Sequence, residues 1–301
     1  MGKNSKKKLV FSVKANHCII RGVVKKLQDD NKIDLVVHDP TQDFFELETI
    51  PQFLEDIDLL VVKVRNDCSI DLLHLAKIYK IPTLHNFDVV STCKNKISLD
   101  YTLRKIFNDN SKKLSKFMLP KSWNHSLMDV SRFKKWASTR LPIVIKSHNQ
   151  HDKYNRFNFL VQKIDEVDKF CEKYKNFLYY DVYIQKFIEC DGFERKVYVI
   201  GDKVFGIIRE NPIYIYLREK PEKIDVGLIK RERFKVTEDI LQLSKILSHD
   251  LGLKIFGFDL IQPINQNKLF LVDLNDFPSF KGIPNIENEM KNYIKNYVLA
   301  L

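Results

Sequence analysis

Two carboxylates and an amide near the C-terminus have the spacing of a divalent metal site. The segment Lys268–Asn285 reads KLFLVDLNDFPSFKGIPN and begins as an apolar strand that carries Asp273 and Asn275. Side chains two residues apart in a strand point to the same side of a sheet. If this strand forms a hairpin with the preceding run KIFGFDLIQ, Asp259 joins them on that face. Hard oxygen ligands without His or Cys suit Mg²⁺ or Mn²⁺ rather than zinc.

The other face of this hairpin is expected to pack on a core. Its even-numbered positions are all large and apolar: Phe256, Phe258, Leu260, Phe270, Val272 and Leu274. The spacing leaves an alternative open, in which the odd-numbered face is solvated and Asn275–Pro278 is an ordinary turn. The sparse charge in both strands favours the metal site, where ions between carboxylates and a triphosphate would neutralise charge during phosphoryl transfer.

A second hairpin brings cations onto one face. The runs FERKVYVI and KVFGIIRE flank Gly201-Asp202, a two-residue turn signal that pairs residue 200 with residue 203. Lys196 then faces Ile207, and Arg209 is its diagonal neighbour. An anion between the two cations would relieve their repulsion. Equally, Glu194 lies opposite Arg209 and could pair with it, and spacing alone does not decide.

Two further lysines end apolar strands. Lys146 closes PIVIK before a polar loop, and Lys63 closes DLLVVK at the C-terminal edge of a parallel sheet, where such folds tend to bind ligands. Either lysine could simply extend to solvent. Taken together, these cations and the three oxygen ligands indicate a polyanion held against metal ions.

The elements that must position these residues fall into an α/β pattern followed by antiparallel hairpins. The first part alternates strands with helices and predicts a parallel sheet; its elements are strands Lys8–Val13, Ile33–His38 and Asp58–Val64, helix Cys68–Tyr79 and a short strand from Ile81. The middle predicts an antiparallel pair, a helix and a strand at Leu141–Lys146, Phe157–Gln162, Asp165–Tyr174 and Tyr179–Ile188. The two hairpins and helices Thr237–His249 and Ile286–Leu299 complete the chain.

Composition narrows the class of partner. The 301 residues carry a net charge of +11, which is either a lysine-rich solvated surface or the attraction of an anionic ligand. We find no nucleic-acid-binding module and no apolar run of roughly 18 residues, so neither a nucleic acid nor a membrane is expected as a partner. The five scattered cysteines form no C-x-x-C pair and predict reduced thiols in a cytoplasmic protein.

Three segments together resemble the inositol 1,3,4-trisphosphate 5/6-kinase family, which has the ATP-grasp fold. They are YIQKFIECDGFERKVYVIGDKV, IIRENP and FGFDLI followed by LVDLNDFPSFKG, and the similarity runs from about residue 8 to the final helix. The resemblance implies an α/β fold with an N-terminal parallel α/β domain and two antiparallel-sheet-plus-helix lobes. The implied parts are a substrate-binding domain at residues 1–108, a central ATP-grasp lobe at 109–189 and a C-terminal ATP-grasp lobe with the metal site at 190–301.

The resemblance also assigns residues. It implies metal ligands Asp259, Asp273 and Asn275; ATP contacts Lys146, Gln185, Lys186, Phe187, Ile188 and Arg209; substrate contacts Lys14, Lys63, Arg156, Lys196, Asn275 and Ser279; and catalytic residues Lys196, Arg209 and Asp273. The implied cofactors are ATP and Mg²⁺, with two ions, and the implied substrate is an inositol tris- or tetrakisphosphate. We expect a monomer. An arginine that the family has near the nucleotide is without a clear counterpart, because Ser91-Thr92-Cys93 occupies that region.

Two other functions stay open at this point. An ATP-grasp carboxylate–amine ligase would share the metal hairpin and differ in the substrate domain, where many cations favour a polyphosphate acceptor. A non-catalytic inositol phosphate or nucleic-acid binder is the other alternative, and the glycine-free loop Ser147–Asn155 after Lys146 is its main support.

Overall fold

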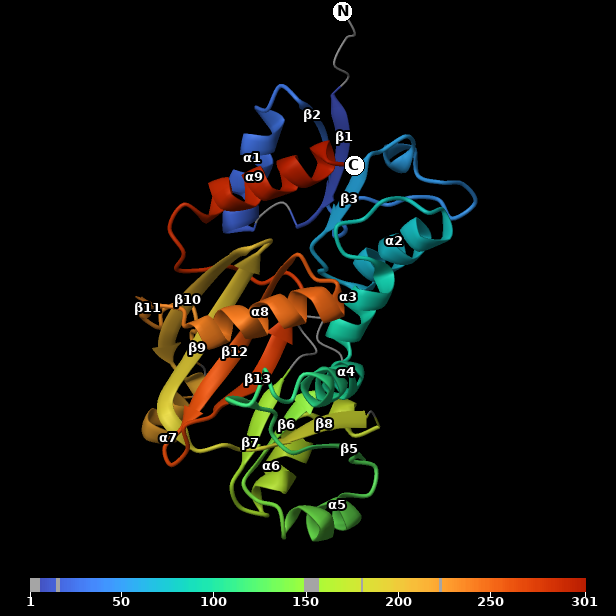
Figure 1. The fold of residues 1–301 in the computed structure, drawn as a ribbon. Coiled ribbons are helices and arrows are strands. Elements are labelled where there is room, and N and C mark those ends of the chain that lie inside the picture. The colour runs from blue at the N-terminus through green and yellow to red at the C-terminus, as the bar shows by residue number, and fades with distance from the viewer. Residues whose placement is uncertain (1–5, 15–16, 149–156, 180, 222–223) are drawn as a thin grey trace, which may run out of the picture.

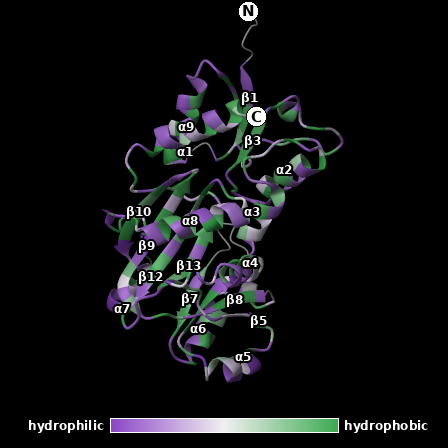
Figure 2. Ribbon diagram, viewed as in Figure 1, coloured by the Kyte–Doolittle hydropathy of each residue, from purple (hydrophilic) through white to green (hydrophobic). Residues whose placement is uncertain are grey.

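Three β-sheets follow one another through the described part of the chain (Figure 1). The structure is a computed structural model that describes residues 6–14, 17–148, 157–179, 181–221 and 224–301. Figure 2 shows long hydrophobic stretches in strands such as β12 (Ile255–Pro263) and β13 (Leu269–Asn275), whereas the helices α8 (Glu238–Leu251) and α9 (Ile286–Leu299) show both colours. The sheets therefore form the apolar interior and the helices cover it.

The first sheet is parallel, as the sequence predicts. Its order is β2-β1-β3, and Leu9 of β1 lies opposite Leu35 and Leu59 of its two neighbours. The strands are β1 (Lys7–Ser12), β2 (Ile33–His38) and β3 (Leu59–Val62), with α1 (Cys18–Gln28), η1 (Gln52–Leu54), α2 (Asp67–Ile78) and α3 (Phe87–Lys94) around them. The short strand expected from Ile81 is only an isolated bridge between Leu60 and Thr83.

The second sheet is antiparallel and has the order β5-β8-β6-β7. It contains β5 (Ser122–Ser126), β6 (Ile143–Ser147), β7 (Asn158–Val161) and β8 (Asp181–Lys186), with α5 (Val130–Ala137), α6 (Glu166–Lys173) and η2 (Lys175–Phe177). The predicted pairing of β6 with β7 is confirmed, and Lys146 lies opposite Asn158. Phe133 of α5 and Phe170 of α6 are fully buried, so these helices close the core of this layer.

The third sheet has the order β11-β10-β9-β12-β13-β4. Its strands are β4 (Phe117–Met118), β9 (Cys190–Ile200), β10 (Lys203–Glu210), β11 (Arg231–Phe234), β12 (Ile255–Pro263) and β13 (Leu269–Asn275); α4 (Lys96–Asp109), α7 (Pro212–Glu219) and α8 (Glu238–Leu251) complete this part. The register of the β9–β10 hairpin is confirmed, because Lys203 pairs with Ile200. Thr237 caps α8 by accepting a hydrogen bond from the amide of Ile240.

The core face of β13 differs from the alternation that the sequence predicts. Asp273 pairs with Asp259, but Leu271 pairs with Leu260, so Val272 is one extra residue in β13. Because of this bulge, the side chains of β13 before Asp273 point to the opposite faces from those that simple alternation predicts. Leu271 therefore joins the main core together with Phe256, Phe258, Leu260 and Leu274. Phe270 and Val272, expected on that face, lie in a separate small cluster with Cys190 and Ile261.

The last helix, α9 (Ile286–Leu299), returns to the N-terminal layer and has the predicted bounds. It packs beside α1, as the red and blue helices of Figure 1 show. The ammonium groups of Lys291 and Lys295 bind the buried carboxylate of Asp30 at 2.6 and 2.7 Å. The domain boundaries near residues 108 and 189 stay a prediction. Two elements join sheets that are distant in the chain, because β4 pairs with β13 and α9 packs against α1 and β1.

The sequence predicts no membrane span and reduced cysteines. Within the part of the chain that the structure describes, no helix combines the length and apolar character needed to cross a bilayer. All five cysteines are free thiols. Cys93 and Cys190 are buried, while Cys18 is exposed.

Candidate active site

The two carboxylates of the predicted metal site lie directly opposite each other. Asp259 of β12 and Asp273 of β13 are register partners, and Asn275 lies opposite Gly257 two pairs further along. The Asn275 amide nitrogen donates to Asp273 Oδ2 at 3.2 Å. The hairpin therefore places all three predicted ligands on one face, as the alternation from Asp273 to Asn275 requires.

Each of these carboxylates binds a lysine. Lys196 of β9 lies opposite Asp259 in the register of β9 and β12, and its ammonium group binds that carboxylate. Lys96, the first residue of α4, binds Asp273. Because the two lysines come from different elements, β12 and β13 are joined at this point to both β9 and α4.

The β9–β10 hairpin shows which partner Arg209 has, a question that spacing alone left open. Glu194 lies opposite Arg209 and forms a buried ion pair with it. The Lys196 ammonium group is also 3.4 Å from Glu194 Oε1. Arg209 therefore has a carboxylate partner within the sheet, and it lies in the same charged cluster as Asp259.

Burial and neighbouring charge move the two aspartate pKa values apart. Burial raises the pKa of Asp259 to about 6, and the negative charges of Glu194 and Asp273 add to this effect against Lys196. Burial also raises the pKa of Asp273, but Lys96 and Lys146 outweigh it and hold that pKa below its ordinary value. Asp273 is thus the carboxylate that stays ionised over the wider pH range.

Lys146 spans from the second sheet to the third. Its ammonium group donates to Gln185 Oε1 at 2.6 Å and to the carbonyl oxygen of Val272 at 3.2 Å. Burial lowers the pKa of Lys146 to about 8, although nearby Asp273 opposes this shift. The predicted phosphate-binding lysine therefore lies beside the metal hairpin, and its charge is partly desolvated.

In the segment predicted to border the adenine, successive side chains point in different directions. Gln185 is buried, and its amide nitrogen donates to the Tyr183 hydroxyl at 2.9 Å. The Lys186 ammonium group points elsewhere and donates to the carbonyl oxygens of Arg140 and Leu141 at 2.9 and 2.8 Å. The next two residues lie near Tyr214: Phe187 is 6.2 Å from its ring centroid, and Ile188 packs in the same small apolar cluster.

The residues predicted to bind substrate through the first sheet gather at its C-terminal edge. Lys63 directly follows β3, and its amide donates to the carbonyl oxygen of Ser12, two residues before Lys14. The Lys63 ammonium group donates to the carbonyl oxygens of Phe277 and Pro278, just before Ser279. Burial, with help from Lys94, lowers the pKa of Lys63 to about 7. Arg156 lies outside the described residues.

Lys96 is the site residue that the sequence interpretation missed. Asn95 caps α4 by accepting hydrogen bonds from Ile97 and Ser98, which fixes Lys96 in the first turn. Its side chain is 6% exposed. The signal in the sequence is weak, because a lysine after a capping asparagine is ordinary on a helix surface. Only the contact with Asp273 shows that this lysine is internal.

The donor set fits a hard divalent cation. Among the described residues, no three His, Cys, Asp or Glu side chains are arranged to hold a metal, so an amide must supply the third group. Asp259 and Asp273 each bind an ammonium group, so each carboxylate has an oxygen that faces a position suited to a cation. Carboxylate and amide oxygens are the ligands that Mg²⁺ accepts, so the residues fit the ion.

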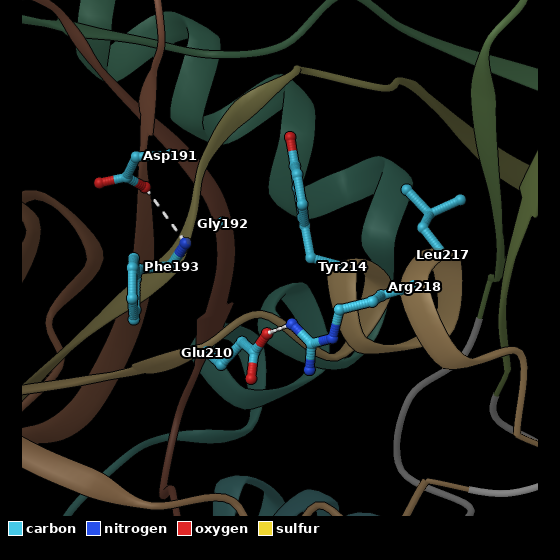
Figure 3. A pocket seen from close by; sticks show the side chains of 7 residues that line it. All are labelled: Asp191, Gly192, Phe193, Glu210, Tyr214, Leu217 and Arg218. Carbon is cyan, nitrogen blue, oxygen red and sulfur yellow. Dashed lines mark hydrogen bonds and ion pairs between the residues drawn. The ribbon is translucent and has the colours of Figure 1, made fainter.

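Two cavities of different size lie near the second and third sheets. A space of about 20 Å³ adjoins Lys96, Gln185 and Asp273, which is room for about one water molecule. A larger cavity of about 570 Å³ lies at the far end of β9 and β10 against α7. Figure 3 shows Tyr214 between Phe193 and Leu217 there, with Arg218 directed towards Glu210.

Solved structures identify the fold. The chain has a TM-score of 0.71 with an ATP-grasp RimK domain protein from Sphaerobacter thermophilus, at 14% identity and over 97% of this chain and 99% of that one. The TM-score is 0.67 with D-alanine–D-alanine ligase from Bacillus anthracis, at 13% identity over 98% and 96%. The ATP-grasp ligase PsnB complexed with precursor, Mg and ADP gives 0.61, at 11% identity over 98% and 99%. The chain has the ATP-grasp fold, as expected.

Sequence comparisons point to a particular family within that fold. Residues 217–296 match the sequence model of the inositol 1,3,4-trisphosphate 5/6-kinase ATP-grasp domain, which confirms the resemblance. Inositol-tetrakisphosphate 1-kinase 6 of Oryza sativa is 28% identical over 34% of this chain, and inositol-tetrakisphosphate 1-kinase of Xenopus laevis is 27% identical over 37%. These alignments span 22% and 33% of the relatives' own lengths. The chain thus has the ATP-grasp fold and is similar, in its C-terminal part, to the inositol 1,3,4-trisphosphate 5/6-kinase ATP-grasp domain.

Proposed function

We propose that this protein is an ATP- and Mg²⁺-dependent inositol phosphate kinase. It transfers the γ-phosphate of ATP to a ring hydroxyl of an inositol tris- or tetrakisphosphate. The observation that carries the proposal is the Asp259–Asp273 pair, which binds Lys196 of β9 and Lys96 of α4 and has Lys146 of β6 nearby. The match of residues 217–296 to the kinase family includes both aspartates and Asn275.

The metal-binding role falls to the β12–β13 hairpin. Asp259, Asp273 and Asn275 would hold Mg²⁺, which neutralises phosphate charge when bound. We propose two ions, as in the family that the sequence resembles. Asp273 is the better anchor because Lys96 and Lys146 keep its pKa low, whereas burial raises the pKa of Asp259 to about 6.

The cations around the hairpin would bind and orient the phosphates. Lys146 donates across the gap between the second and third sheets and would move with the triphosphate. The ion pair with Glu194 holds the guanidinium group of Arg209 in place, and from there it would donate to the transferred phosphate. Preorganised charge of this kind is most of what phosphoryl transfer requires from a protein. Gln185, Lys186, Phe187 and Ile188 would border the base, and the side chain of Lys186 would face away from it.

The acceptor would lie between the first sheet and the metal hairpin. Lys63 and Lys14 stand at the C-terminal edge of the first sheet, and Lys63 contacts the backbone of Phe277 and Pro278. With Lys196, Asn275, Ser279 and Arg156 they form the proposed substrate set. A polyanion between these lysines would replace the carbonyl oxygens that Lys63 now binds. The protein is proposed to act as a monomer.

ATP turnover with a panel of inositol phosphates tests this function. The wild type should release ADP with at least one of them, and Asp273→Ala should abolish the release while the protein remains folded by circular dichroism. NMR of the product identifies the phosphorylated hydroxyl. Absence of turnover with every inositol phosphate would contradict the proposal. A panel of carboxylates and amines run in parallel tests carboxylate–amine ligation, the other chemistry of this fold.

A further inference from the structure

The carboxylate pair binds two lysines where it would bind a metal. The Lys196 ammonium group contacts Asp259 Oδ2, and the Lys96 ammonium group contacts Asp273 Oδ1. Both lysines are largely buried, with side chains 16% and 6% exposed. A buried ammonium group leaves a carboxylate only when another cation and another anion replace the lost pair, because unpaired buried charge is costly.

The charges of the whole cluster add a second constraint. Within the part of the chain that the structure describes, four cations face three carboxylates here: Lys96, Lys146, Lys196 and Arg209 against Glu194, Asp259 and Asp273. The cluster is therefore already positive. A divalent ion arriving alone would increase that excess and would also have to displace an ammonium group. A divalent ion arriving with a triphosphate brings net negative charge, which matches the excess.

Lys96 lies between the strand that carries Lys146 and the carboxylate of Asp273. Its amide donates to the carbonyl oxygen of His148 at 3.0 Å, which links the start of α4 to the end of the strand that carries Lys146. Its side chain contacts Asp273 of the third sheet. The Lys96 ammonium group binds Asp273, and the Lys146 ammonium group donates to the carbonyl oxygen of Val272, the residue before Asp273, so the two cations lie on either side of this part of β13.

We propose that Lys96 and Lys196 compete with divalent metal for Asp273 and Asp259, so that the metal binds tightly only as its complex with a nucleotide. When that complex binds, each carboxylate exchanges its ammonium partner for the metal, and Lys96 turns to a phosphate oxygen. This inference rests on the proposed function for the identity of the nucleotide. In this inference, Lys96 keeps divalent metal from Asp273 until the metal arrives with a nucleotide.

The inference predicts opposite effects of one substitution. Lys96→Met frees Asp273, so the variant should bind Mn²⁺ alone at least about tenfold more tightly than the wild type. The same variant loses a phosphate contact, so it should bind Mg²⁺–ATP about tenfold more weakly. A lysine that only stabilised the fold would move both affinities in the same direction.

Two titrations on the full chain measure these effects. The six-line electron paramagnetic resonance signal of free Mn²⁺ reports metal binding without nucleotide, and calorimetry reports Mg²⁺–ATP binding. Lys105→Met is the matched control, since it removes one positive charge from the exposed Lys105–Asp109 pair on the same helix and should leave both affinities unchanged. Lys96→Arg keeps the charge and should restore weak Mn²⁺ binding. Thermal melting confirms that each variant is folded.

The outcomes separate the inference from the proposed function. Tighter Mn²⁺ and weaker Mg²⁺–ATP binding by Lys96→Met supports the inference. If Mn²⁺ binding is unchanged or weaker while the wild type binds Mg²⁺–ATP, the exchange is wrong and the proposed function stands. If the wild type does not bind Mg²⁺–ATP, the proposed function fails, whatever the Mn²⁺ titration gives. Lys196→Met applies the same Mn²⁺ test to Asp259.

Discussion

The ammonium group of Lys146 donates to the carbonyl oxygen of Val272 across 3.2 Å, from the second sheet to the third. Val272 is the extra residue of the β13 bulge and directly precedes Asp273. The bulge therefore brings the phosphate-binding lysine and the metal-binding aspartate of the proposed site together. The amide nitrogen of Gln185 in β8 donates to the same carbonyl oxygen at 3.4 Å, so two side chains of the second sheet meet the third sheet at this bulge.

Replacing Lys146 should weaken nucleotide binding specifically. Lys146→Met removes a charged hydrogen bond to phosphate, worth about 1.5–3 kcal/mol, which is a loss of roughly ten- to a hundredfold in Mg²⁺–ATP affinity. Calorimetry measures it. Lys134→Met is the matched control, because that ammonium group pairs with Asp168 on the helices that cover the second sheet, and the variant should bind Mg²⁺–ATP like the wild type. Equal losses of affinity in both variants would contradict this placement of Lys146.

The efficiency with ATP should fall as the pH rises through about 8. Burial lowers the pKa of Lys146 to about 8, so above that pH the free enzyme loses the charge that binds phosphate. The pH dependence of kcat/KM reports the free enzyme, and the alkaline limb should lie near this value. Lys146→Arg, which stays protonated, should move that limb to higher pH. A limb that stays in place in the arginine variant would assign it to another group.

The Glu194–Arg209 pair should behave as a buried ion pair. Arg209→Met leaves the Glu194 carboxylate without its arginine partner and should lower the free energy of unfolding by about 3–5 kcal/mol. The double variant Arg209→Met/Glu194→Met should recover part of this loss, because no partner is left buried alone. Urea unfolding of the two single variants and the double variant completes the cycle. Additive losses would mean that the pair is not coupled.

Acid should destabilise the protein through His85. Its Nε2 accepts the amides of Lys254 and Ile255 at 3.0 and 3.1 Å, which requires a neutral ring, and burial lowers its pKa from 6.5 to about 4. Between these two values the unfolded chain binds more protons than the folded one, so stability falls as the pH falls from 6.5 to 4. The full loss is on the order of 3 kcal/mol.

A variant that cannot titrate isolates this contribution. The side-chain oxygen of His85→Gln can accept the same amides, so its stability should change less over that pH interval. Urea unfolding at several pH values compares the two proteins. An equal dependence on pH in both would assign the acid sensitivity to other groups, such as buried Asp276 beside Lys94.

The sequence by itself determined the local parts of the site. Alternation in a strand put Asp273 and Asn275 on one face, the Gly201-Asp202 turn fixed Lys196 against Ile207, and the three ATP-grasp segments indicated the fold. These features depend on residues close in the chain or on a turn of fixed length. Local backbone geometry is therefore enough to set them.

Only the tertiary structure decided which distant charges meet. A one-residue bulge at Val272 is invisible in the alternating pattern, yet it moves Phe270 out of the main core. Lys96 reads as an ordinary first-turn lysine until packing of α4 against β13 brings it to Asp273, 177 residues away. Such contacts arise because burying the apolar faces of the sheets and helices fixes their positions, and the charged groups then pair with whatever that packing places within reach.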